Sequence, residues 1–161
     1  MAETIYKKTA EAVVQKLIEK KETIAFAESC TGGLACAKLV DVPSASAVLS
    51  ASFITYSNEA KTVLRGVPEN LIAAHGAVSE PVAGAMAAGA AKRAGAQIGV
   101  GISGIAGPTG ALPGKPIGTV CFGFFLKGKE KTFTKYFGDI GRTAVRKAAV
   151  QFVFETLSEL L

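Results

Sequence analysis

The sequence predicts an α/β fold in which helices cover both faces of a mixed sheet, forming a three-layer α/β/α sandwich. Helix-like and strand-like segments alternate early in the chain, as they do where parallel strands are joined by helices. A later hairpin pattern adds antiparallel strands, which makes the sheet mixed. The chain has 161 residues, of which 49% are hydrophobic and 19% charged, so it can bury a core. We expect one domain over residues 1–161.

The first forty residues predict a helix, a strand and a second helix. Residues 3–20 place apolar side chains, Ile18 among them, on one helical face with charged residues opposite, which is typical of a docked amphipathic helix. The apolar run 23–27 predicts a strand, and the glycine-containing segment 28–33 predicts a tight turn. Residues 34–40 then resume the helical pattern.

The next segment predicts a second strand and a short helix. Residues 47–56 end in β-branched and aromatic side chains, which favour a strand. Ser57 and Asn58 are a helix start signal, and the helix that follows carries Lys61.

An alanine-rich helix and a buried strand come next. Ser79 and Pro81 open the helix, which is expected to stop near Gly95. Its small side chains predict close packing against a sheet or another helix. Residues 97–102 then predict a buried strand.

The last third predicts a loop, a hairpin and a final helix. Residues 103–116 form a loop punctuated by glycine and proline. Residues 117–126 and 132–137 predict two strands joined by a Lys-Gly-Lys turn. Residues 143–161 predict a helix with an apolar face.

The charge and cysteine patterns exclude several classes of partner. The 18 Lys and Arg residues outnumber the 13 acidic residues, but they are scattered and not interleaved with aromatic residues, so we expect a solvated surface and no nucleic-acid partner. No apolar stretch reaches the roughly 18 residues that span a bilayer, and residues 1–21 do not resemble a signal peptide. We therefore expect a cytosolic protein with no membrane partner. Three cysteines without metal-ligand spacing predict reduced thiols, no metal site and no cofactor.

Ser29 is the candidate nucleophile. It lies where the first strand runs into a helix, so backbone N–H groups of the following residues would converge beside its hydroxyl and form an oxyanion hole. The alternative is that Ser29 only caps the helix and that Gly32 and Gly33 only permit the turn. A rival nucleophile is Cys30, because thiols are intrinsically better ones, but we expect its side chain to point into the core.

A nucleophilic serine needs a base, and lysine is the better candidate. The single histidine, His75, precedes Gly76 where a helix is expected to end, a place more typical of a structural role. Lys61 lies in the first turn of its helix, where the helix dipole and partial burial would lower the pKa of its ammonium. Tyr56 could relay the proton or orient the amine. The alternative for Lys61 is an ordinary solvated surface lysine.

The loop after the buried strand is a candidate anion site. Ser103, Gly104 and Gly107 would expose backbone N–H groups that can hold a phosphate or carboxylate, although an ordinary connector has the same composition. The spacing is not that of a P-loop. Three basic side chains could complement the anion or be solvated, namely Lys115, Arg142 and Arg146.

Four segments in this order resemble the nicotinamide-nucleotide amidase family, also called the CinA C-terminal domain or competence/damage-inducible protein family. They are AESCTGG at 27–33, TYSNEAK at 55–61, HGAVSE at 75–80 and GIAGP at 104–108. The likeness covers nearly the whole chain, and four motifs at matching spacings are far more specific than one.

The resemblance implies a CinA C-terminal-domain-like fold and the hydrolysis of nicotinamide mononucleotide to nicotinate mononucleotide and ammonia in pyridine-nucleotide recycling. The family's serine-lysine centre and assisting tyrosine fall on Ser29, Lys61 and Tyr56. A cytoplasmic homo-oligomer, a dimer, is also implied. The expected substrate-binding residues are Cys30, Thr31, Gly32, Gly33, Asn58, Ser103, Gly104, Gly107, Lys115 and Arg142.

The chain departs from the family pattern in three places. Thr109 and Gly114 stand where members commonly carry Asp and Glu, and the segment 138–142 has an apparent two-residue insertion before Arg142. These departures bear on ligand specificity and on the role of Arg142, and they permit a nucleotide-binding regulatory module without turnover. A structural or protein-interaction role is suggested by the family's historical name and by no feature of this sequence. The larger N-terminal domain that some members carry is missing, so we expect no pyrophosphatase activity.

Overall fold

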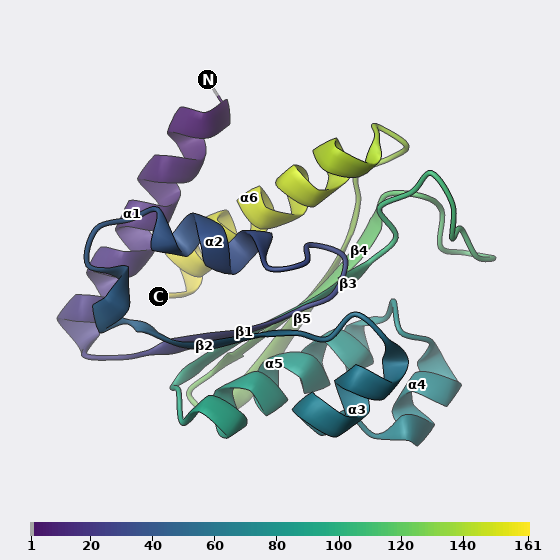
Figure 1. The fold of residues 1–161 in the computed structure, drawn as a ribbon, viewed down its shortest axis with the longest axis horizontal. Coiled ribbons are helices and arrows are strands. Elements are labelled where there is room, and N and C mark those ends of the chain that lie inside the picture. The colour runs from purple at the N-terminus through teal and green to yellow at the C-terminus, as the bar shows by residue number, and fades with distance from the viewer. Residues whose placement is uncertain (1) are drawn as a thin grey trace.

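The computed structural model describes residues 2–161 and has a five-stranded mixed sheet between two layers of helices (Figure 1). The strands are β1 (Ile24–Glu28), β2 (Leu49–Ile54), β3 (Ile98–Gly104), β4 (Thr119–Leu126) and β5 (Lys129–Tyr136). Their order in the sheet is β2-β1-β3-β4-β5. Strand β1 is parallel to β2 and β3, whereas β4 is antiparallel to both β3 and β5. The predicted fold class and the hairpin are therefore confirmed.

Each face of the sheet is covered by its own group of helices (Figure 1). One face carries α1 (Ala2–Lys20), α2 (Leu34–Val40) and α6 (Arg142–Leu160). The other carries α3 (Asn58–Arg65), α4 (Glu69–His75) and α5 (Glu80–Ala94). A short 3-10 turn, η1 (Ala45–Ala47), precedes β2. None of the described helices is both long enough and apolar enough to cross a membrane.

The two faces pack by different means. Between the sheet and the helices α1, α2 and α6, large side chains such as Phe26, Phe122 and Phe154 are fully buried. Helix α5 instead lies directly on glycines of the strands: a Cβ built on Gly99 or Gly101 would fall 2.0 or 2.2 Å from a backbone carbonyl oxygen of the helix. This contact confirms the close packing that the small side chains of α5 predict.

Several boundaries differ from the sequence prediction. Ser103 and Gly104 end β3 instead of opening the following loop, because both pair with β4 in the sheet. Glu28 likewise completes β1 and is not part of the turn. Ile18 is 37% exposed although it was expected on the buried face, whereas Phe154 is fully buried without having been singled out.

Candidate functional site

Most predicted site residues meet in one cleft at the carboxyl ends of β1, β2 and β3. This edge of a sheet is where α/β proteins commonly bind their ligands. The cleft has a volume of about 200 Å³. The predicted residues that line it are Ser29, Cys30, Tyr56, Asn58, Lys61, Ser103, Gly104 and Arg142. Thr31, Gly32, Gly33, Gly107 and Lys115 do not line it.

Helix α3 holds Lys61 against Ser29. The helix begins after Ser57, whose Oγ accepts a hydrogen bond from the Ala60 N–H at 3.0 Å, so the predicted start is confirmed. Lys61 is only 1% exposed. Its Nζ lies 3.1 Å from Ser29 Oγ, 2.9 Å from the Thr55 carbonyl oxygen and 3.2 Å from the Tyr56 carbonyl oxygen. Lys61 is therefore not a solvated surface lysine.

The three contacts of Lys61 Nζ are compatible with both charge states of the amine. An ammonium donates to all three oxygens, whereas a neutral amine donates to the two carbonyl oxygens and keeps its lone pair for the hydroxyl proton of Ser29. Burial lowers the pKa of Lys61, because desolvation disfavours the ammonium form. The lowered pKa favours the neutral amine, in which these contacts suit a general base.

Burial shifts the pKa of Cys30 in the direction opposite to that of Lys61. Its thiol is buried in the core cluster, as expected, and burial, followed by the nearby Glu28, raises its pKa to about 12. The thiol is consequently protonated at neutral pH and is a weak nucleophile there. A neutral thiol also removes the negative charge by which Cys30 would raise the pKa of Lys61.

The turn after β1 offers fewer free N–H groups than the sequence suggests. The Gly32 N–H donates to the Ser29 carbonyl oxygen at 3.0 Å, and the Gly33 N–H donates to Glu28 Oε2 at 3.1 Å. Within residues 2–161, the Cys30 and Thr31 N–H groups are the two of the segment 29–33 that have no oxygen acceptor, and the Cys30 N–H faces its own sulfur. Cys30 lines the cleft, whereas Thr31 is fully buried and does not, so the Cys30 N–H is the candidate oxyanion donor.

Glu28 is a structural residue of the site that sequence reasoning missed. Its carboxylate is fully buried and accepts three backbone N–H groups, from Gly33, Ala35 and Cys36, at 2.9–3.1 Å. These bonds satisfy amides at the start of α2, where the N-cap Gly33 has no side chain. The sequence signal was present: an acidic residue ends an apolar strand just before a glycine-rich turn.

Tyr56 and Arg142 form the exposed rim of the cleft. Arg142 donates through Nη2 to the Tyr56 hydroxyl at 2.8 Å and through Nη1 to the Gly107 carbonyl oxygen at 3.0 Å. Tyr56 therefore reaches Lys61 through its backbone carbonyl, and its hydroxyl contacts Arg142 instead. This geometry suits positioning of the amine better than a proton relay.

The residues of the proposed anion loop are held in different ways. Ser103 is buried, and its hydroxyl donates to the Ala77 carbonyl oxygen at 2.7 Å. Gly107 has a φ of +82°, and a Cβ on it would come within 2.6 Å of Ile117, so only glycine fits there. Lys115 donates to the His75 carbonyl oxygen at 2.8 Å, at the end of α4 and outside the lining of the cleft.

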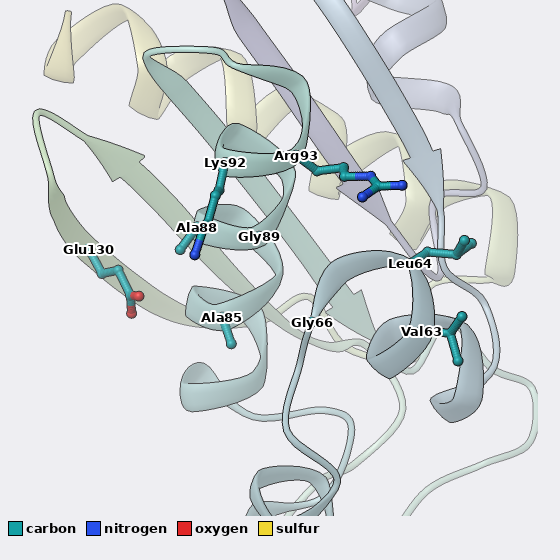
Figure 2. A pocket seen from close by; sticks show the side chains of 9 residues that line it. All are labelled: Val63, Leu64, Gly66, Ala85, Ala88, Gly89, Lys92, Arg93 and Glu130. Atoms are coloured by element: carbon teal, nitrogen blue, oxygen red, sulfur yellow. The ribbon is translucent and has the colours of Figure 1, made fainter.

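A larger hollow of about 730 Å³ lies elsewhere, between α3, α5 and the edge of β5 (Figure 2). Val63 and Leu64 flank it on α3, and small residues of α5 form its floor. Its charged residues are Lys92, Arg93 and Glu130, and it contains no candidate nucleophile paired with a base. The smaller cleft is therefore the chemically equipped one. In the part of the chain described by the structure, no three His, Cys, Asp or Glu residues form a group that could hold a metal ion.

Comparisons with known proteins agree with this fold and cleft. The family model described as CinA C-terminal domain matches residues 6–161. A CinA-like protein of Chlorobaculum tepidum is 55% identical over 117 residues, which are 73% of this chain and 28% of that protein. A CinA-like protein of Anaeromyxobacter sp. is 47% identical over 149 residues, 92% of this chain and 35% of that protein. The chain thus spans about a third or less of these curated relatives.

Solved structures match over nearly their whole length. The competence/damage inducible protein CihA from Agrobacterium tumefaciens has a TM-score of 0.94 at 36% identity and covers 97% of this chain and 95% of its own. A competence-damaged protein (CinA) superfamily protein from Escherichia coli has a TM-score of 0.93 at 34% identity, covering 97% of this chain and 90% of its own. The names of these four proteins state no reaction. On this evidence the chain belongs to the CinA C-terminal domain family.

Proposed function

We propose that this protein is a metal-independent amidase that hydrolyses the carboxamide of nicotinamide mononucleotide to nicotinate mononucleotide and ammonia. One observation carries the proposal: a buried lysine amine with two carbonyl acceptors lies 3.1 Å from the hydroxyl of Ser29. Serine and lysine paired in this way form a known type of activated nucleophile. The choice of substrate follows the resemblance of the four motifs, as does our proposal of a cytoplasmic homodimer.

The proposed reaction begins when neutral Lys61 takes the hydroxyl proton of Ser29 and Ser29 Oγ attacks the carboxamide carbon. The Cys30 N–H stabilises the negative oxygen of the tetrahedral intermediate. Lys61 returns its proton to the nitrogen, the carbon–nitrogen bond breaks, and ammonia leaves the acyl-enzyme. Water, deprotonated by Lys61, then attacks the ester, and Lys61 returns that proton to Ser29 Oγ as the carbon–oxygen bond breaks, which releases nicotinate mononucleotide and restores Ser29. The sum is amide plus water giving acid plus ammonia.

Ammonia release from purified protein tests the proposal. We expect turnover of nicotinamide mononucleotide and little turnover of nicotinamide riboside, because the phosphate can form charge-assisted hydrogen bonds with basic groups and N–H groups at the cleft. Besides Lys61, Arg142 is the basic residue in its lining. Nucleotide binding without ammonia release would favour a regulatory binding module instead. Failure to bind any nucleotide would favour a structural or interaction role.

Cys30→Ala is expected to keep most activity. The substitution removes a protonated thiol and leaves the Cys30 N–H in place, so kcat should stay within about fivefold of wild type. The lost buried sulfur should lower the free energy of unfolding by about 1 kcal/mol. Ammonia assays and thermal unfolding measure the two effects. A folded but inactive Cys30→Ala protein, beside an active Ser29→Ala protein, would reassign the nucleophile to Cys30.

A further inference from the structure

Arg146 on α6 reaches the turn that carries the nucleophile. Its Nε donates to the Cys30 carbonyl oxygen at 3.0 Å and its Nη2 donates to the Thr31 carbonyl oxygen at 2.8 Å. Among the residues that the structure describes, no carboxylate forms a salt bridge with Arg146. A half-buried guanidinium is thus bonded to two successive backbone carbonyls and to no opposite charge.

This contact fixes the direction of a backbone N–H group. In a trans peptide unit the C=O and the following N–H point in opposite directions. Holding the Cys30 carbonyl therefore sets the direction of the Thr31 N–H. In the same way, the Ser29 carbonyl accepts from the Gly32 N–H at 3.0 Å and so sets the direction of the Cys30 N–H. The peptide units on both sides of Cys30 are therefore held, and Cys30 lines the cleft beside Ser29, whereas Thr31 is fully buried and does not.

Glu28 fixes the other half of the same turn. Its carboxylate binds the Gly33, Ala35 and Cys36 N–H groups, while Arg146 binds two carbonyls just before them. Glu28 therefore holds backbone donors and Arg146 holds backbone acceptors on neighbouring residues of the turn. The planar guanidinium donates in two fixed directions, which a lysine ammonium on a flexible stem does not reproduce.

We propose that Arg146 is a positioning residue of the oxyanion hole: by holding the Cys30 and Thr31 carbonyls it fixes the turn in which the Cys30 N–H, beside Ser29 in the lining of the cleft, receives the substrate's carbonyl oxygen. This inference rests on the proposed amidase function and adds to it a residue that does not touch the substrate. Preorganised donors act on charge that develops in the transition state, so Arg146 should influence kcat far more than substrate binding.

Kinetics of Arg146→Ala and Arg146→Lys test the inference. Both should lower kcat for nicotinamide mononucleotide about 100-fold, the size seen when one oxyanion donor is lost. KM should stay within about threefold, and the pH midpoint of kcat should not move, because Lys61 is untouched. Arg93→Ala is the matched control, since Arg93 is exposed in the distant hollow, and its kcat should equal that of wild type.

A second readout separates the positioning role from folding and from the choice of substrate. Thermal unfolding shows which variants are folded, and mass spectrometry after p-nitrophenyl acetate treatment measures acetyl transfer to Ser29. We expect slow acetylation in folded Arg146→Ala and Arg146→Lys proteins. If the wild-type protein is acetylated on Ser29 but releases no ammonia, only the proposed substrate is wrong. The positioning role would be overturned if Arg146→Lys kept the wild-type kcat, or if the variants had a raised KM and an unchanged kcat. It would also be overturned if the wild-type protein were neither acetylated nor released ammonia.

Discussion

Ser29→Ala and Lys61→Ala should each lower kcat for nicotinamide mononucleotide by at least about a thousandfold, and the double variant should be hardly worse. In the described part of the chain, Lys61 Nζ is the only basic group within hydrogen-bond distance of Ser29 Oγ, so no second base can replace it. A serine without its base is nearly as inert as no serine, so the two losses cannot multiply. Ammonia release under saturating substrate measures all three variants.

Folding and binding controls make this result interpretable. Lys61→Met is the better control for burial, because it keeps an unbranched side chain of similar length in a site that is 1% exposed. It should fold, bind nicotinate mononucleotide and release no ammonia. Losses that multiply in the double variant would mean that Ser29 and Lys61 act independently, and the pairing mechanism would be wrong.

Tyr56→Phe should have a smaller effect than either member of the pair. The substitution removes the hydroxyl that contacts Arg142 but keeps the backbone carbonyl that accepts from Lys61. The amine therefore retains both of its carbonyl acceptors. Ammonia release by Tyr56→Phe is therefore the comparison for the Ser29 and Lys61 variants, because this substitution changes the rim of the cleft and leaves Ser29 and Lys61 in place.

Local signals explain why the fold and the contact between Ser29 and Lys61 could be predicted from the sequence. Ser57 and Ser79 both cap helices, each accepting a backbone N–H, so the starts of α3 and α5 were correct. The strand, turn and helix around Ser29 were visible as a change in periodicity. Placing Lys61 beside it needed the base argument and the resemblance, because 32 residues separate the two.

Contacts between distant segments explain what the sequence did not predict. Arg146 binds a carbonyl 116 positions away, and nothing near it in the chain distinguishes it from a ligand for an anion. The role of Glu28 depends on where the backbone of α2 begins relative to β1, which is a three-dimensional property. Lys115 was expected at an anion site because it follows the glycine-rich loop, yet its ammonium donates to the last residue of α4.

The pH dependence of kcat tests the charge state on which the mechanism depends. Lys61 must be neutral to accept a proton, and burial lowers its pKa below the ordinary lysine value. The neutral fraction increases as pH rises toward that pKa, so kcat should rise with pH and level off above it. A rate that falls as pH increases through neutrality would contradict a lysine base.

Lys61→Arg should be inactive at every pH, because a guanidinium stays protonated and cannot accept the proton of Ser29. Its charge would also lie beside two carbonyls and no carboxylate, so the variant is expected to unfold at a lower temperature than wild type. Binding of nicotinate mononucleotide, measured below that temperature, separates inactivity from unfolding. Should folded Lys61→Arg release ammonia at the wild-type rate, Lys61 would be at most an electrostatic partner, because positive charge alone would then be sufficient.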